Sequence, residues 1–301
     1  MEKKLNIDVA GSISEFEELM KEFMIRRVLY RIIFRGKGLD FDGYRDLNPD
    51  DDASDIDWKA SSRGNKLLVR QYIEERDLKI MFVIDISENM LFGSSEKLKC
   101  EYAAEVALAL AHLILISGDK IGFVLVNDKV SEILFPDKIK KPFDTLVDGL
   151  NNISEYGGIA DLDSALKYLG DYLPNSINAV IVISDFLRIE KDFSKTLRDF
   201  SGRFETMAIM IKDPLDKTLP KIDGEVILED PKTSEQIIID PMIASKNYEK
   251  NALEQDKMVK SMFLSNDIDF VEMSTDKPFA FALAEFLKER LAKGKYIVPM
   301  R

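Results

Sequence analysis

The chain has 301 residues, of which 46% are hydrophobic and 32% are charged, and its formal net charge is −12. These proportions are those of a soluble globular protein with a substantial core. The acidic balance disfavours general nucleic-acid binding and favours basic protein partners.

The cysteine content and the apolar runs indicate the compartment. Cys100 is the sole cysteine, so the chain forms no intramolecular disulfide, which suits a reducing cytoplasm. The first residues show no signal peptide, and the longest apolar run, 106–116, is too short to cross a bilayer. We therefore expect a cytoplasmic protein with no membrane span.

The N-terminal part of the chain predicts a small α+β module. Ser14 and Glu17 form a capping-box pattern, which predicts an amphipathic helix from Glu15 to about Ile33. A Gly- and Asp-rich stretch follows, in which we expect loops and short strands, and Leu67 to Ile73 reads as a strand. We assign residues 1–77 to this module. We expect Trp58 to anchor it to the rest of the molecule, and the alternative is that Trp58 is an exposed recognition residue.

From Lys79 onward, apolar runs of strand length alternate with helical patterns. This alternation predicts an α/β fold with a doubly wound, mostly parallel sheet over residues 78–301. We expect strands at 80–84, 121–126, 130–135, 179–183, 206–211 and 268–273, and a hairpin at 225–228 and 236–239. We expect helices opening near 94–95 and running through 98–113, then at 141–150, 162–169, 192–200, 244–264 and 278–292.

Polar residues with metal-binding chemistry follow the apolar run Ile80–Ile84. Asp85, Ser87 and Asn89 place a carboxylate, a hydroxyl and an amide at every second position. In a parallel sheet, ligands bind at the carboxyl ends of the strands, where these oxygens could meet one hard cation. The alternative is that the same residues are ordinary turn and cap residues.

A second buried strand, 179–183, ends in Ser184 and Asp185. If the two strands are neighbours, Asp85 and Asp185 face each other, and their charges repel unless a cation or proton lies between them. The loop containing Gly157 and Gly158 precedes a helix and would approach the same edge of the sheet. Three separate segments therefore converge on one predicted cation site.

These three segments resemble a metal-ion-dependent adhesion site of von Willebrand factor A domains. Farther upstream and downstream, the chain resembles domain-of-unknown-function family 58. The segments that carry this second resemblance are 36–38, 41–45, 51–52, 56–60, Arg63, 74–75, 212–214, 219–220 and 230–231. Together the resemblances imply a von Willebrand A or Rossmann-like fold with a smaller N-terminal module.

The adhesion-site motif is modified at two places. Asn89 stands where the motif has its second serine, and Ile159-Ala160 stand where a threonine usually follows the glycines. Asp161 is the candidate substitute for that lost hydroxyl. The resemblance thus implies a degenerate Mg²⁺ or Mn²⁺ site made of Asp85, Ser87, Asn89, Asp161 and Asp185.

The resemblance implies a non-enzymatic protein-binding adaptor in which an acidic residue of a partner fills the open position of the metal. Members of the family are often encoded beside MoxR-type AAA+ ATPases, which implies such a partner and a role in protein maturation. One alternative is a metal-dependent hydrolase using Asp85 and Asp185, but His112 offers it no general base. The other alternative is a metal-free scaffold.

Overall fold

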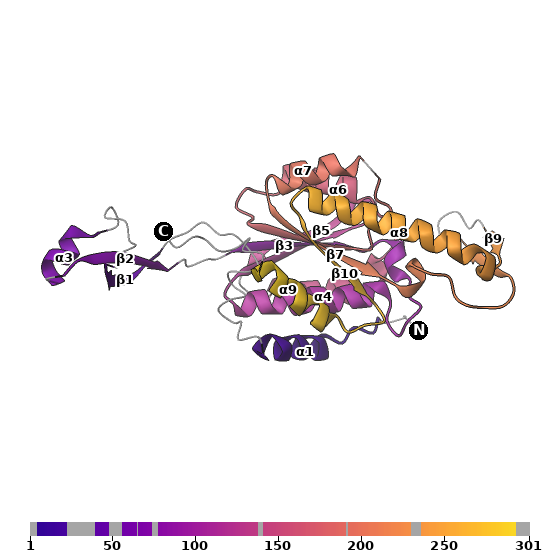
Figure 1. The fold of residues 1–301 in the computed structure, drawn as a ribbon, viewed down its shortest axis with the longest axis horizontal. Helices are drawn as coiled ribbons and strands as arrows, with labels where there is room; N and C mark the ends of the chain where they lie inside the picture. The colour runs from indigo at the N-terminus through magenta and orange to yellow at the C-terminus, as the bar shows by residue number, and fades with distance from the viewer. Residues whose placement is uncertain are drawn as a thin grey trace.

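The computed structural model describes residues 5–22, 40–47, 56–64, 66–73, 78–137, 141–190, 192–229 and 236–292. Its centre is a six-stranded sheet with the order β10-β7-β6-β3-β4-β5, in which only β5 runs antiparallel to its neighbour (Figure 1). The doubly wound α/β prediction is confirmed. The strands are β3 (Lys79–Asp85), β4 (Lys120–Val126), β5 (Val130–Asp137), β6 (Ala179–Ser184), β7 (Glu205–Lys212) and β10 (Asp269–Ser274).

Helices cover both faces of this sheet (Figure 1). One face carries α1 (Val9–Glu22), α4 (Lys99–Ile116), α5 (Lys141–Asn151) and α9 (Phe279–Ala292). The other face carries α6 (Leu162–Tyr172), α7 (Phe193–Ser201) and α8 (Pro241–Ser265). Successive side chains of a strand point to opposite faces, so Phe82 packs in the first layer and Val83 in the second. Burial on both faces explains why β3 and β6 are continuous apolar runs.

The first helix begins earlier than the sequence predicts. The Asp8 carboxylate accepts the N–H of Gly11 at 2.9 Å and so caps α1, which places Ser14 inside the helix. The predicted continuation beyond Glu22 lies outside the described residues. Phe16 is buried against Phe279, and α1 packs on α4 and α9 as part of the main body.

A two-stranded antiparallel sheet, β1 (Asp40–Asp46) with β2 (Leu68–Ile73), carries the helix α3 (Trp58–Gly64) and stands apart from the central sheet in Figure 1. Asp57 caps α3 by accepting the N–H of Lys59 at 3.0 Å. Trp58 is 66% exposed at the first turn, so the prediction that it anchors the two parts is wrong. The division at residue 77 stays a prediction.

The remaining elements follow β7. The strands β8 (Val226–Glu229) and β9 (Gln236–Ile239) form the expected hairpin. The helix α8 begins at Pro241, earlier than predicted, because Asp240 accepts the N–H of Met242 at 2.9 Å and proline suits the first turn.

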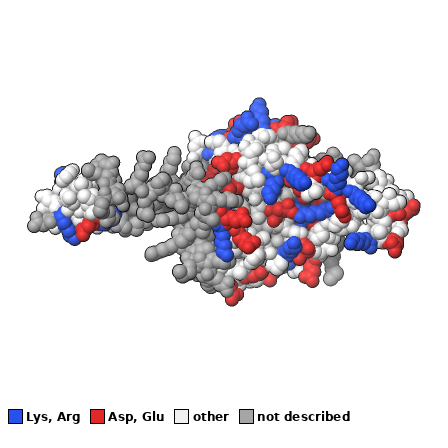
Figure 2. Space-filling model, in the orientation of Figure 1, with Lys and Arg blue, Asp and Glu red and all other residues white. Residues whose placement is uncertain are grey.

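The described helices include none with the length and apolarity that crossing a bilayer requires. On the face of the main body shown in Figure 2, acidic and basic side chains are interspersed. That face therefore presents no continuous basic surface to a polyanion.

Candidate functional site

The site begins at Asp85, the last residue of β3. Because β3 pairs with β6 in the register Ile84 to Ile183, the side chain of Asp85 lies beside Ser184. Ser184 Oγ donates to Asp85 Oδ2 at 2.6 Å, and the N–H of Ser87 donates to Asp85 Oδ1 at 2.8 Å. The carboxylate is thus held rigidly at the carboxyl edge of the sheet, and it is 99% buried.

Ser87 is also fully buried, and its hydroxyl makes no hydrogen bond of acceptable geometry within the described part of the chain, although it lies close to Asp85. Leaving a buried hydroxyl unsatisfied costs about 1–3 kcal/mol, so such groups usually face a ligand or water. Asn89 follows in the short helix η2 (Glu88–Leu91) and is half-buried. The structure thus brings Asp85 and Ser87 together and places Asn89 in the first turn of η2, which begins directly after Ser87.

The glycine loop is bonded directly to this first segment. The N–H of Gly157 donates to Ile86 O at 2.9 Å, and the N–H of Glu88 donates to Gly158 O at 3.0 Å. Gly157 and Gly158 have φ angles of 146° and 72°, a backbone region that favours glycine. The predicted convergence of these two segments is confirmed.

Gly158→Ala tests how much the site depends on this loop. A Cβ at Gly158 would lie 2.7 Å from Asp128 Oδ1 and would occupy the left-handed region, so we expect a loss of about 1–2 kcal/mol in urea unfolding. Gly118→Ala is the matched control, since its φ of 94° imposes strain while nothing lies within 4 Å of the added Cβ. Equal stability of wild type and the Gly158 variant would contradict the expectation.

The described contacts of Asp161 give it a role that differs from the predicted one. Its carboxylate accepts the N–H of Ser164 at 3.0 Å and caps α6, while its own N–H donates to Asn127 O at 3.0 Å. It is exposed and lines a groove of about 500 Å³ together with Asp128. Among the described residues, no hydrogen bond or ion pair joins it to Asp85 or Asp185, so its role as a ligand stays a prediction.

Asp185 follows β6 and is 99% buried. Its Oδ1 accepts the N–H of Leu187 at 3.1 Å, and its Oδ2 accepts a hydrogen bond from Lys99 Nζ at 2.7 Å. The next residue, Phe186, has φ of 50°, a strained conformation for a bulky residue, and its ring packs on Phe263. The buried ring fixes the tight turn that presents Asp185.

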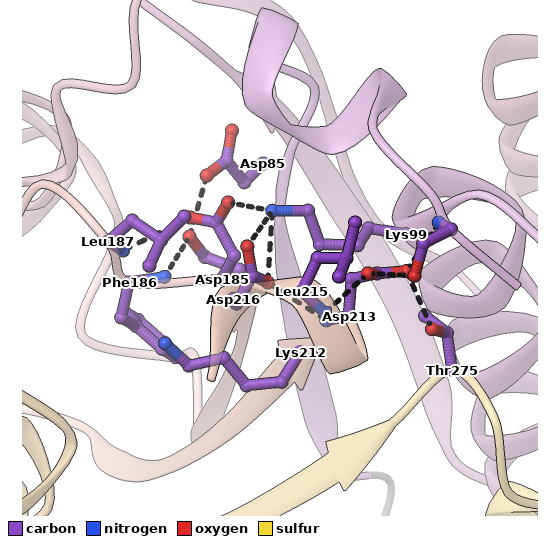
Figure 3. A network of polar contacts seen from close by, with 12 residues as sticks. Asp85, Lys99, Asp185, Phe186, Leu187, Lys212, Asp213, Leu215, Asp216 and Thr275 are labelled. Carbon is purple, nitrogen blue, oxygen red and sulfur yellow. Dashed lines mark hydrogen bonds and ion pairs between the residues drawn. The ribbon is translucent and has the colours of Figure 1, made fainter. Parts of the chain in front are cut away.

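Lys99 is the unexpected member of the site. It is the first residue of α4, its side chain is 99% buried, and its ammonium lies between Asp185 and Asp216, whose Oδ2 is 3.3 Å away (Figure 3). Burial lowers the pKa of Lys99, but the two carboxylates more than offset this effect and leave the pKa above its ordinary value. The ammonium is therefore a permanent positive charge inside the site.

Asp216 is held in place by its own short helix, η4 (Pro214–Asp216), directly after β7. Asp216 Oδ2 accepts the N–H of Asp213, and the Asp213 carboxylate accepts the N–H of Ser94 at 2.7 Å and the Thr275 hydroxyl at 3.2 Å. These bonds connect η4 to the loop before α4 and to the end of β10. Asp216 is consequently a fixed second partner for Lys99 (Figure 3).

The electrostatics of the site favour an added positive charge near Asp85. Burial first, and the neighbouring charge of Asp185 second, raise the pKa of Asp85 to about 6, although hydrogen bonds from Ser184 and Ser87 oppose the shift. Lys99 contacts Asp185 and Asp216, and the described residues place no cation against Asp85 itself. The charge on Asp85 is thus the least compensated one.

These donors fit a hard divalent cation, with the unsatisfied Ser87 hydroxyl as the structural observation in favour. The described residues contain no group of three or more His, Cys, Asp or Glu side chains arranged to hold a metal. A cation here would rely on Asp85, the Ser87 hydroxyl and Asp185, with water or a partner completing its shell.

Sequence reasoning missed Lys99 and Asp216 as parts of the site, and it named Ser184 only as part of the segment that ends in Asp185. One signal in the sequence could have indicated Lys99: this lysine directly precedes the apolar stretch of a helix that is buried along most of its length. Asp216 follows a strand end at Asp213-Pro214, but its pairing with Lys99 depends on the order of strands.

The fold and the site define a doubly wound α/β domain with a buried, charged polar cluster at the carboxyl edge of its sheet. Residues 43–258 match the model of the family described as protein of unknown function DUF58. The chain belongs to this family, which confirms the family resemblance seen in the sequence.

A relative and two solved structures are also similar to this chain. The uncharacterized protein Rv1480 of Mycobacterium tuberculosis is 29% identical over 199 residues, which is 65% of this chain and 62% of that protein. The chain therefore matches less than two thirds of the relative's length. The crystal structure of the conserved hypothetical protein BatB from Bacteroides thetaiotaomicron is 11% identical over 71% of this chain and 99% of that chain, with a TM-score of 0.47. The SpRpn10 VWA domain is 13% identical over 68% of this chain and 92% of that chain, with a TM-score of 0.42.

Proposed function

We propose that this protein is a non-enzymatic protein-binding adaptor whose recognition site is a divalent-cation site at Asp85, Ser87 and Asp185. The cation, Mg²⁺ or Mn²⁺, would supply a Lewis-acidic position that an acidic residue of a partner protein can occupy. Asn89 and Asp161 complete the proposed ligand set, directly or through water.

The buried Ser87 hydroxyl is the observation that carries this proposal. It has no hydrogen-bond partner of acceptable geometry among the described residues, and it lies beside Asp85, whose pKa is raised first by burial and second by the charge of Asp185. A cation at this position would satisfy the hydroxyl and neutralise Asp85 together.

The proposed partner is an AAA+ ATPase of the MoxR type, as the family resemblance implies, and the proposed work is protein maturation in the cytoplasm. Cys100 is buried and unpaired, which suits a reducing compartment.

Catalysis has less support than binding. The sole histidine, His112, lies on α4 with Nε2 3.2 Å from Glu17 Oε1 of α1, far along the helix from Lys99. A hydrolase that used Asp85 and Asp185 would need a general base within hydrogen-bond reach of its water. His112 packs at the α1–α4 contact and does not supply one.

Asp85→Ala tests the adaptor directly. We expect the variant to fold and to lose capture of the MoxR-type ATPase encoded nearest to its gene, in a pull-down with Mg²⁺ present. Asp128→Ala, an exposed acid near the same edge, is the matched control and should retain capture. Equal capture by wild type and Asp85→Ala would overturn the proposed site.

A metal-free scaffold is the second candidate, and the Lys99–Asp185 contact of 2.7 Å favours it, because an ammonium already neutralises one ligand. Calorimetric titration with MgCl₂ and MnCl₂ separates the two functions. Heat from one saturable site supports the cation-dependent adaptor, and the absence of any binding supports the scaffold.

A further inference from the structure

Two carboxylates compete for one buried ammonium at the candidate site. Lys99 Nζ is 2.7 Å from Asp185 Oδ2 and 3.3 Å from Asp216 Oδ2, and the lysine side chain is 99% buried. The shorter contact engages a proposed metal ligand, and the longer one engages a residue that the proposed site does not use.

We propose that Lys99 is a tethered counter-ion that occupies Asp185 when no metal is bound and moves onto Asp216 when a divalent cation enters. This inference rests on the proposed cation site and adds its regulation. The ammonium would set the affinity of the site for the cation. Its move onto Asp216 would also change the contacts of η4 when the site is occupied.

The geometry supplies both positions of the ammonium. Asp185 is the one proposed ligand that is already neutralised, so a cation can gain its carboxylate only by displacing the lysine or by sharing Asp185 with it. Like charges repel in a buried site, and Asp216 is a second carboxylate within reach of the same ammonium, with Oδ2 3.3 Å from Lys99 Nζ (Figure 3). A modest rotation of a long lysine side chain can therefore exchange one partner for the other.

The second position is connected to the rest of the molecule. Tyr248 of α8 donates its hydroxyl to Leu215 O of η4 at 2.7 Å, and Thr218 donates to Glu249 of α8 at 2.7 Å. A stronger Lys99–Asp216 pair would hold η4 more firmly against α4. The α8 segment that follows the β8–β9 hairpin shares these contacts and would be stabilised with it.

Cation titration of full-length variants tests this inference. With MgCl₂ and MnCl₂ in a calorimeter, we expect Lys99→Met to bind more tightly by about 5- to 150-fold, the usual range of coupling between linked sites. We expect Asp216→Asn to bind more weakly, because Lys99 then has only Asp185 as partner. Arg290→Met is the matched control, since the Arg290 side chain is also buried but pairs with Asp269 at 2.8 Å, and its cation affinity should stay close to that of wild type.

The double variant Lys99→Met/Asp216→Asn separates displacement from simple loss of negative charge. If Asp216 acts through Lys99, its substitution should have little effect in the Lys99→Met background. An equal weakening in both backgrounds, or unchanged affinity of Lys99→Met beside a binding wild type, would overturn the tethered counter-ion and leave the adaptor proposal standing.

Two further outcomes are decisive. Binding by Lys99→Met alone would overturn the exchange, because the lysine then excludes the cation from wild type and does not move onto Asp216. No binding by any variant overturns the cation site together with its regulation. If Lys99→Met does not fold, Asp216→Asn still tests the exchange, since unchanged or tighter cation binding by it would contradict the proposal.

Discussion

Replacing Lys99 with methionine should lower the free energy of unfolding by about 3–5 kcal/mol, as measured by urea unfolding at pH 7.5 without divalent cations. The substitution keeps most of the aliphatic volume but leaves Asp185 and Asp216 without their shared cation. Asp185 is 99% buried, so solvent cannot replace the lost ammonium.

Neutralising one of the two unpaired carboxylates provides the control for this loss of stability. Lys99→Met/Asp185→Asn should recover a large part of the stability, because the amide needs no cation. If Lys99→Met costs less than about 1 kcal/mol, the value typical of exposed ion pairs, then the pair does not compensate buried charge and the expectation is wrong.

Replacing Asp85 with asparagine should have the opposite effect on stability at neutral pH. The pKa of Asp85 is about 6 in the folded protein, against an ordinary value of 3.8 that applies to the unfolded chain. Because the folded pKa is raised, the neutral acid is favoured by folding. The contribution of the neutral Asp85 carboxyl to folding stability is present below pH 3.8, falls as the pH rises, and is fully lost above about pH 6.

The asparagine side chain stays neutral at every pH, so this loss is absent from the variant. Asp85→Asn should therefore match wild type near pH 4 and exceed it by roughly 2–4 kcal/mol at pH 7.5, from a shift of about two pKa units. Urea unfolding at both values measures the difference. Equal stability at pH 7.5 would show that Asp85 is not destabilised by its surroundings.

Divalent cations extend the same measurement to the proposed site. Saturating Mg²⁺ should raise the midpoint of thermal unfolding of wild type at pH 7.5, because binding to the folded state alone stabilises it. Asp85→Asn should lose this response while being the more stable protein without metal. A stabilised variant that lacks the metal response is not explained by general damage to the fold.

The position of the site follows from local sequence patterns. The apolar run before Asp85 and the polar residues after it predicted a buried strand followed by a polar loop, and the structure has this arrangement. Ser184-Asp185 gave the same signal on β6, and the Gly157-Gly158 loop closes the edge. Such signals are local because the apolar run of a buried strand and the turn residues after it are contiguous in the sequence.

Local patterns failed where side chains made unexpected long-range or cap contacts. The start of α1 was misplaced because Asp8 is a better cap than the pattern around Ser14 suggested. Trp58 was expected to anchor the N-terminal module to the rest of the molecule, and it lies exposed on α3. Neither burial nor capping is determined by residue type alone.

The sequence by itself determined the α/β alternation, the ends of the two buried strands and the identity of Asp85, Ser87 and Asp185 as oxygen donors. Only the tertiary structure decided what neutralises Asp185. Lys99 and Asp216 are 117 residues apart along the chain and meet because α4 starts at the edge where β7 ends. An ion pair between such distant residues leaves no periodic signal in the sequence, because it depends on the order of the strands in the sheet.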